Sequence, residues 1–309
     1  MFIENSIKSY QMRDRISILS HFRDVIATIW LPRKFWRILN LIEFYRLVNS
    51  GLELLSRFSE KPRSINLDNV LFPTDIDSRS VIEIVGASST GKTLLLCQFI
   101  ARCILPAQYR GIKIDGCDAC AILIDTLGHV QISKITELMT FTIRDAFQAA
   151  NVQPPSVETV DYIVNKSLEN LTVISCCNNN QLQLTLHTLE DELLINERIA
   201  LLAIDNILAY YWQARKERSI LSMDCYAKDL IRIVRSSQFH TATVYTRWDG
   251  PVPKQDWLCT NLLERTSINY RLQLGKSTVT QQFTCRVQST NNVKQICYTI
   301  SDSGIKWIQ

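Results

Sequence analysis

Short runs of apolar residues alternate along the chain with longer stretches in which apolar residues recur every three or four positions. The short runs are typical of strands covered on both faces, and the longer stretches are typical of helices. Strands are predicted at residues 81–85, 119–125, 172–176, 199–205 and 241–246. Helices are predicted at residues 92–105, 129–150, 157–171, 181–194 and 219–235. This alternation predicts a parallel sheet with helices on both faces and with ligands at the carboxyl ends of the strands.

The pattern changes to a period of two in the last forty residues. Residues 270–274, 281–287 and 295–299 alternate between apolar and polar side chains, and turn-forming stretches separate them. A final turn at residues 301–304 precedes the apolar residues Ile305 and Trp307. These segments are expected to form antiparallel hairpins that extend the sheet. The predicted fold class is therefore α/β, with a mainly parallel sheet flanked by helices and with C-terminal antiparallel hairpins.

The first 49 residues are expected to form a basic N-terminal extension that is partly disordered or helical. Residues 1–50 carry eight Lys or Arg and four acidic residues, so the whole net charge of +4 resides there. A targeting or membrane-surface helix is an alternative, although the acidic residues argue against a transit peptide. Helical periodicity at residues 35–58 predicts a helix leading into a core that spans residues 50–309.

The composition, with 46% hydrophobic and 21% charged residues, is that of a soluble globular protein. The ten cysteines and the absence of a secretory signal pattern favour reduced thiols over disulfides. Six of them lie in apolar patterns and are expected in the core: Cys97, Cys103, Cys176, Cys177, Cys285 and Cys297. Cys117 and Cys120 form an isolated C-x-x-C pair, which is a weak zinc signal. No apolar run is long enough for a membrane helix, so no membrane association is expected.

The first predicted strand ends at a glycine that opens the pattern Gly-x-x-x-x-Gly-Lys-Thr, directly before a predicted helix. In such a loop the glycines let backbone N–H groups surround a phosphate at the positive end of the helix. Lys92 is expected to reach the β- and γ-phosphates, and the Thr93 hydroxyl to ligate Mg²⁺. A chance match in an ordinary strand–turn–helix is the alternative. The expected phosphate-binding residues are Gly86, Ala87, Ser88, Ser89, Thr90, Gly91, Lys92 and Thr93.

A phosphate loop of this kind needs a carboxylate near its Mg²⁺, supplied by an acid at the end of a buried strand. Asp205 fits this requirement because it ends the apolar run at residues 201–204. An unpaired carboxylate in that position would be costly to bury. ATP and Mg²⁺ are therefore the expected cofactors, with Thr93 and Asp205 as the metal ligands.

The phosphate loop, the acid-ended strand, residues 121–126 and the terminal hairpins together resemble the core of RecA-type recombinases. Over residues 50–309 the chain resembles, more specifically, a eukaryotic recombinase paralogue of the RecA-like family. The segments that carry this likeness are residues 50–57, 101–106, 207–212 and 303–304.

The resemblance implies a nuclear protein in homologous-recombination repair of DNA double-strand breaks. It also implies pairing with the D-type recombinase paralogue, within a four-paralogue complex that assists the strand-exchange recombinase. Roles in meiosis and at replication forks, and contact with single-stranded or branched DNA, belong to the same expectation.

Two departures from the family pattern concern ATP hydrolysis. Active recombinases place a glutamate where this chain has Leu127, and leucine cannot accept a proton. Members of the family also carry a glutamine that senses the γ-phosphate, and this chain has Arg247 in its place. Arg247 is interpreted either as a phosphate contact or as a solvated loop residue. Asp125 or His129 as a substitute base is a weaker hypothesis than slow or absent hydrolysis. No catalytic residue is therefore assigned. A DNA-stimulated ATPase and, less well supported, a P-loop small-molecule kinase remain alternatives.

Two segments lie where the family contacts DNA. Residues 248–257 hold two tryptophans and Lys254, which suit base stacking, although a compact loop with Trp257 buried is the favoured interpretation. Residues 213–218 hold three cations, with a solvated helix start as the default. The sequence Phe-x-x-Ala at residues 147–150 resembles a protomer-joining motif, but its helical context favours ordinary packing.

Overall fold

The structure, a computed structural model, describes residues 64–196, 198–218, 222–236, 241–248, 268–277, 282–289 and 292–308. These residues all belong to one compact unit that spans Arg57–Gln309. The predicted extension 1–49 and the predicted helix 35–58 lie outside the described residues. The boundary between extension and core therefore stays a prediction.

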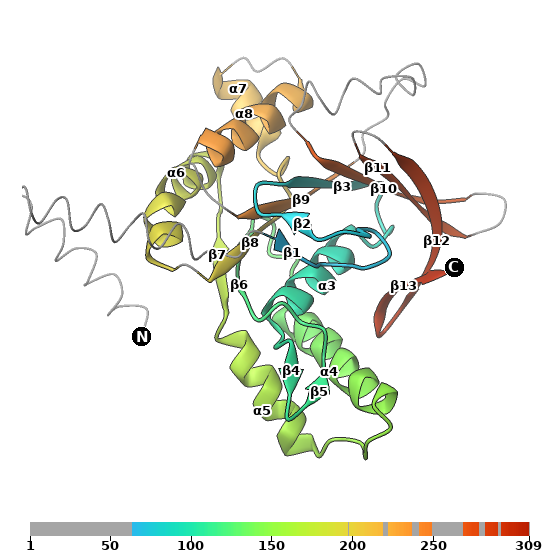
Figure 1. Cartoon of the computed structure of the whole chain (residues 1–309). Coiled ribbons are helices and arrows are strands. Elements are labelled where there is room, and N and C mark those ends of the chain that lie inside the picture. Colours follow the sequence, from blue (N-terminus) through green and yellow to red (C-terminus); the bar gives the residue numbers. More distant parts are fainter. Residues whose placement is uncertain are drawn as a thin grey trace, which may run out of the picture. The chain divides into compact units, whose positions relative to one another are not determined.

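One large sheet organises the described part of the chain (Figure 1). Its strand order is β13-β12-β11-β10-β3-β9-β8-β6-β7. The parallel part consists of β3 (Val81–Gly86), β9 (Ala242–Trp248), β8 (Ile199–Asp205), β6 (Cys120–Asp125) and β7 (Leu171–Ser175). β10 (Tyr270–Lys276) runs parallel to β3 and begins an antiparallel series with β11 (Phe283–Ser289), β12 (Val293–Ser301) and β13 (Gly304–Ile308). The predicted fold class is confirmed.

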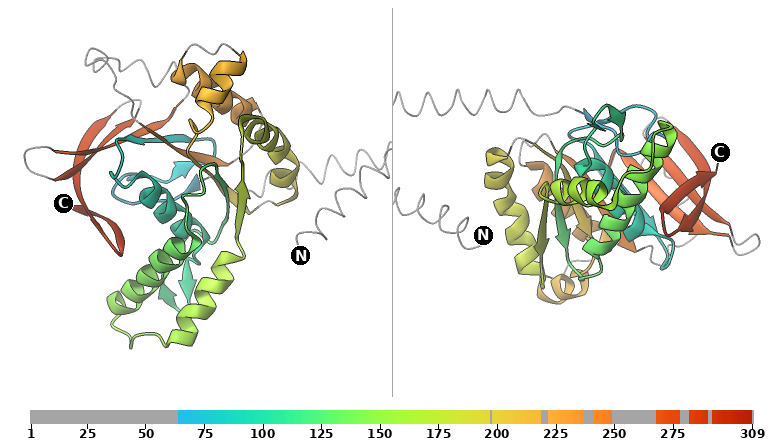
Figure 2. Two further views of the ribbon diagram at one scale, coloured as in Figure 1. Left: turned by 180° about the vertical axis from the view of Figure 1, so that it is seen from behind. Right: turned by 90° about the horizontal axis from the view of Figure 1, so that it is seen from below.

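Helices cover both faces of the parallel strands (Figures 1 and 2). α3 (Lys92–Ile104), α4 (Ile132–Ala149) and α5 (Val157–Leu168) contribute to one hydrophobic core. α6 (Asn179–Ile195), α7 (Tyr211–Arg218) and α8 (Met223–Ser236) contribute to the other. Successive residues of a strand point to opposite faces, so Leu201 lies in the first core and Leu202 in the second. No helix of the described residues is long and apolar enough to cross a membrane.

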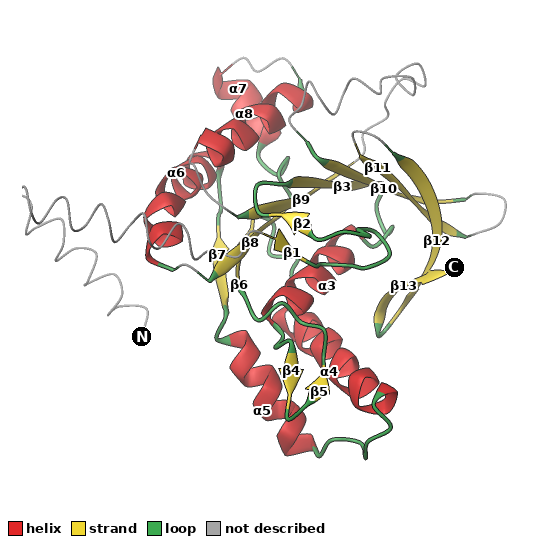
Figure 3. Cartoon of the chain, in the orientation of Figure 1, coloured by secondary structure: helices red, strands yellow, loops and turns green. Residues whose placement is uncertain are grey.

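The structure corrects some predicted boundaries. α4 begins at Ile132 rather than at residue 129, because Gly128 has a φ of 67° and lies in the turn after β6. Two short strand pairs were not predicted, since two residues are too few for an alternating pattern. They are β1 (Ser64–Ile65) with β2 (Ile76–Asp77), and β4 (Gln108–Tyr109) with β5 (Ile112–Lys113), the second of which lies beside α4 and α5 (Figure 3).

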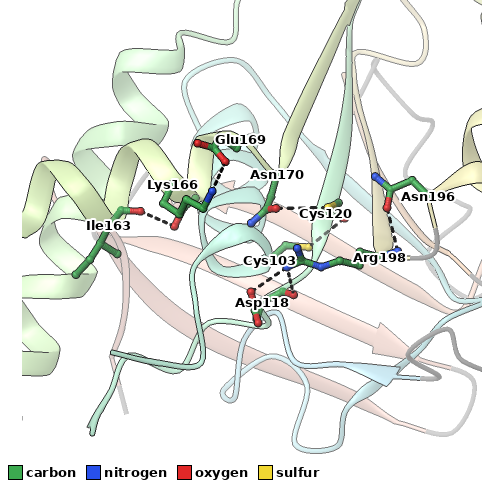
Figure 4. Close-up of polar contacts among 10 residues, drawn as sticks. Cys103, Asp118, Cys120, Ile163, Lys166, Glu169, Asn170, Asn196 and Arg198 are labelled. Carbon is green, nitrogen blue, oxygen red and sulfur yellow. Dashed lines mark hydrogen bonds and ion pairs between the residues drawn. The ribbon is translucent and has the colours of Figure 1, made fainter. Parts of the chain in front are cut away.

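The cysteines among the described residues are free, and most of those assigned to the core are buried. Two of the six differ from that prediction: Cys177, which follows β7, is exposed, and Cys297 on β12 is half-buried. Cys120 lies at the first residue of β6, where its thiol contacts Asn170 Oδ1 at 3.6 Å (Figure 4). The thiol of Cys117 contacts the carbonyl of Asn66 at 3.3 Å instead. No group of three or more His, Cys, Asp or Glu side chains among the described residues is arranged to hold a metal ion.

Phe147 lies on α4 with only 7% of its surface exposed. It belongs to the first hydrophobic core. The interpretation as helix packing is therefore confirmed for Phe147, whereas Ala150 follows the end of α4 and is exposed.

Candidate nucleotide-binding site

The predicted site residues meet at the carboxyl edge of the parallel strands. β3 leads into the loop at Gly86, and α3 begins after that loop at Lys92. β8 ends at Asp205, two strands away from β3 in the sheet. The Thr93 hydroxyl lies 3.1 Å from Asp205 Oδ2 and 3.3 Å from Oδ1. The structure thus joins the two expected metal ligands, which are 112 residues apart in the sequence.

The loop has the backbone of an anion cradle. Ser89 and Gly91 both adopt positive φ values, 61° and 89°. Gly86 passes so close to β10 that an added Cβ would lie 2.4 Å from the Leu274 carbonyl oxygen, so only glycine fits. α3 begins without a side-chain cap and without an acidic residue in its first turn, and residues 87–89 are exposed. A helix start of this kind favours an anion.

Two side chains fold back onto the loop itself. The Lys92 ammonium donates to the Ala87 carbonyl at 2.7 Å, and the Thr90 hydroxyl donates to the same carbonyl at 2.9 Å. Lys92 is therefore held beside the loop crest, in the region where its predicted role requires a positive charge.

Asp205 is deeply buried and accepts hydrogen bonds from two hydroxyl groups. Only 3% of the surface of Asp205 is exposed, and the hydroxyl groups of Thr93 and Thr246 both donate to its carboxylate. Burial raises the pKa of Asp205; the two hydroxyl groups lower it in part, and the nearby Asp125 raises it further. A carboxylate and a hydroxyl are hard oxygen donors of the kind that Mg²⁺ prefers. The residues present therefore fit a magnesium ion bound with phosphate. Thr246, which ends the buried part of β9, was not predicted from the sequence.

We expect Asp205→Asn to separate magnesium binding from folding. The raised pKa means that the folded protein disfavours the ionised carboxylate, so a neutral amide removes a cost at neutral pH. The unfolding free energy of the protein without nucleotide should change by less than about 1 kcal/mol. Magnesium-dependent nucleotide binding should weaken by at least about tenfold. Thermal melts with and without Mg²⁺ and nucleotide measure both effects, with Asp118→Asn as the matched control.

Asp118 suits this control because it is exposed and paired with Arg198 at 3.0 Å, near the start of β6 (Figure 4). A large loss of stability in Asp205→Asn without nucleotide would contradict this assignment, because it would make the carboxylate a structural group.

The end of β6 holds its acid in a turn. The Asp125 carboxylate accepts from the backbone N–H groups of Gly128 at 2.8 Å, Leu127 at 3.3 Å and Val130 at 3.4 Å. The Leu127 side chain is 43% exposed. Leu127, at which the resemblance to active recombinases expects a proton acceptor, is thus exposed, and the neighbouring Asp125 carboxylate is engaged by its own turn.

The structure contradicts one of the two interpretations of Arg247 made from the sequence, that of a solvated loop residue. Arg247 lies on β9 with its side chain 13% exposed, 3.3 Å from Glu83 and 2.8 Å from Asp224. Its guanidinium pairs with two acids, and its contact with a phosphate stays a prediction. Glu83 is fully buried in β3, and it also pairs with Arg271 and accepts from the Tyr245 hydroxyl at 3.1 Å. An acid inside an apolar strand signals such a network, because a buried carboxylate requires a partner.

An exposed aromatic side chain lies beside a basic one on α7. Residues 213–218 are helical, but they form the body and end of this helix rather than the helix start of the default interpretation. Trp212 is 64% exposed, and the Arg215 guanidinium lies 5.4 Å from the centre of its ring. Trp248, at the end of β9, is 43% exposed. The remaining residues 249–257 of the second predicted DNA segment lie outside the described residues.

A strand–loop–helix with a glycine-rich phosphate loop, facing an acid at the end of a parallel strand, is typical of the P-loop class of proteins. The chain belongs to the Rad51 family, whose model matches residues 61–247.

Two relatives are similar to the chain in sequence. The mouse "DNA repair protein XRCC2" is 29% identical over 171 residues, which cover 54% of this chain and 55% of the relative. The Arabidopsis thaliana "DNA repair protein XRCC2 homolog" is 24% identical over 189 residues, which cover 54% of this chain and 50% of the relative. The chain thus spans about half the length of the relatives that it matches.

Proposed function

We propose that this protein binds ATP with Mg²⁺ and acts as a recombinase paralogue in homologous-recombination repair of DNA double-strand breaks. The observation that carries the proposal is the joining of Thr93 and Asp205 beside an uncapped helix start. When bound, Mg²⁺ would supply the charge that offsets the nucleotide phosphates. Family membership and similarity to two DNA repair proteins support the repair role.

The proposed working form is a complex in the nucleus. Its partners would be the D-type recombinase paralogue, the other members of a four-paralogue complex and the strand-exchange recombinase that the complex assists. A role in meiotic recombination is part of the same proposal. The nucleotide would stabilise this assembly rather than drive a rapid cycle, since Leu127 replaces the usual base and Asp125 is engaged by its own turn.

The proposal is tested on purified full-length protein, first alone and then with the partner paralogue. Fluorescent ATP measures binding, and release of inorganic phosphate measures hydrolysis. We expect magnesium-dependent binding of ATP. We also expect only a low rate of phosphate release, which Lys92→Ala does not lower because this site hydrolyses ATP slowly or not at all. Steady turnover abolished by Lys92→Ala would contradict slow hydrolysis, and absence of binding would contradict the ATP role.

A DNA-stimulated ATPase is the second candidate. The exposed Trp212 with the stacked Arg215 favours it, because aromatic and arginine planes stack on the bases of single strands. Phosphate release that rises when single-stranded or branched DNA is added would support this candidate. Transfer of phosphate to a nucleoside or sugar would instead indicate a small-molecule kinase, which leaves the C-terminal hairpins without a role.

A further inference from the structure

The last hairpin, β12–β13, lies directly against the phosphate loop. The hydroxyl of Tyr298 on β12 donates to the Thr90 carbonyl at 2.7 Å. Both residues are almost fully buried, with exposures of 1% and 3%. The side chains of Ile300 and Ile305 approach the next residue of the loop, since a Cβ at Gly91 would lie 3.2 Å from each. The antiparallel end of the sheet therefore supports the loop on the side away from its exposed crest.

The Tyr298 ring is fixed by its neighbours. It stacks on Phe283 with ring centres 5.3 Å apart, and it meets Trp307 edge-on at 5.6 Å. The Trp307 indole donates to Asp68 Oδ2 at 2.7 Å, which ties the hairpin to the segment before β3. Burial raises the pKa of Tyr298, so the phenol stays protonated and can donate at any physiological pH.

The hairpin is also attached to the helices that follow the loop and β6. The Gln98 amide on α3 both donates to the Ile305 carbonyl at 3.2 Å and accepts from the Ile305 N–H at 3.0 Å. At the hairpin turn, the Lys134 ammonium on α4 donates to the Asp302 carbonyl at 3.1 Å. Contacts of β13 and of the turn thus attach the hairpin to both α3 and α4, and Figure 3 shows the hairpin at the edge of the sheet beyond α3.

The hydrogen bond from Tyr298 to the Thr90 carbonyl orients the whole peptide group between Thr90 and Gly91. The Thr90 carbonyl and the Gly91 N–H belong to one planar trans peptide group, in which they point in opposite directions. A carbonyl directed at Tyr298 therefore directs the Gly91 N–H away from the hairpin. Gly91 is the N-cap residue directly before α3, and backbone N–H groups at a helix start are those that bind phosphate.

We propose that Tyr298 is a positioning residue for the phosphate loop, which makes the C-terminal hairpin part of the nucleotide site. Its hydroxyl holds the peptide group between Thr90 and Gly91 in the orientation that phosphate binding requires. This inference rests on the proposed binding of ATP, and it extends the site to a residue 208 positions beyond the loop.

The test replaces Tyr298 by phenylalanine, which removes the hydroxyl and keeps the ring. Losing one neutral hydrogen bond that orients the loop should weaken binding of fluorescent ATP by about three- to tenfold. Tyr226→Phe is the matched control, because its hydroxyl is equally buried and donates to Asn179 Oδ1 at 2.8 Å in the other core. Both variants should lose similar thermal stability, whereas only Tyr298→Phe should lose nucleotide affinity.

A second measurement does not depend on nucleotide. Amide hydrogen exchange of the nucleotide-free protein should be faster at residues 86–93 in Tyr298→Phe than in Tyr226→Phe. Equal exchange there in the two variants would overturn the positioning role, whether or not ATP binds. Equal affinity of the wild type and Tyr298→Phe for ATP would overturn it as well. Absence of ATP binding by the wild type, with faster loop exchange in Tyr298→Phe, would contradict the proposed function while supporting the positioning of the loop.

Discussion

Lys92→Ala is expected to weaken ATP binding by about 10- to 100-fold and to leave the protein folded. The ammonium lies beside the crest of the phosphate loop, where hydrogen bonds from a charged group to phosphate contribute about 1.5–3 kcal/mol. Its hydrogen bond to the Ala87 carbonyl is exposed to solvent, so its removal should cost little stability. Titration with fluorescent ATP and a thermal melt measure the two effects.

The matched control is Lys113→Ala, which removes the same charge from an exposed ion pair with Asp115. It should bind ATP as the wild type does. Equal ATP affinity of Lys92→Ala and Lys113→Ala would contradict a nucleotide site at the loop. A fall in affinity with a large loss of melting temperature would show instead that Lys92 supports the fold.

The same variant decides what the nucleotide is for. Tagged wild type and tagged Lys92→Ala are purified from nuclear extract, and the copurifying proteins are identified. Recovery of a recombinase paralogue by the wild type alone would make ATP the assembly switch. Recovery by both forms would make this protein a scaffold whose nucleotide site is dispensable for assembly.

Glu83→Ala is expected to lower the unfolding free energy by about 3–5 kcal/mol, because it removes the shared partner of two arginines. Glu83 is fully buried, and Arg271 and Arg247 both pair with it while only 20% and 13% of their side chains are exposed. Arg247 retains Asp224, but Arg271 loses the ion pair that links β10 to β3. Chemical denaturation measures the difference from the wild type.

Glu83→Gln and Glu169→Ala calibrate this result. Glutamine keeps an oxygen for the Tyr245 hydroxyl and loses only the charge, so its effect should fall between those of the wild type and alanine. Glu169 pairs with Lys166 on the surface at 2.6 Å (Figure 4). Its removal should cause no measurable change in the unfolding free energy. A Glu83→Ala protein as stable as Glu169→Ala would show that the buried network does not hold these strands together.

Much of the fold follows from short-range pattern. β8 has its predicted limits, Ile199–Asp205, because a short unbroken apolar run that ends at an acid is typical of a buried strand. The loop at residues 86–93 was predicted equally well, since its glycines and the following helix start are adjacent in the chain. Boundaries beside turns were less accurate, as the late start of α4 shows, because Gly128 and the Asp125 carboxylate extend the turn.

The partners of buried polar side chains were determined only by the tertiary structure. Arg247 faces Glu83 because β9 lies beside β3 in parallel register, a pairing that no local pattern contains. Tyr298 reaches Thr90 because the antiparallel strands bring β12 back beside the loop, and Thr246 reaches Asp205 across neighbouring strands. By itself the sequence determined the elements, the phosphate loop and its acid, because propensity and periodicity act over a few residues. Strand order and register decided which side chains hold that loop and that acid in place, because buried polar groups find their hydrogen-bond and ion-pair partners on segments that are distant in sequence.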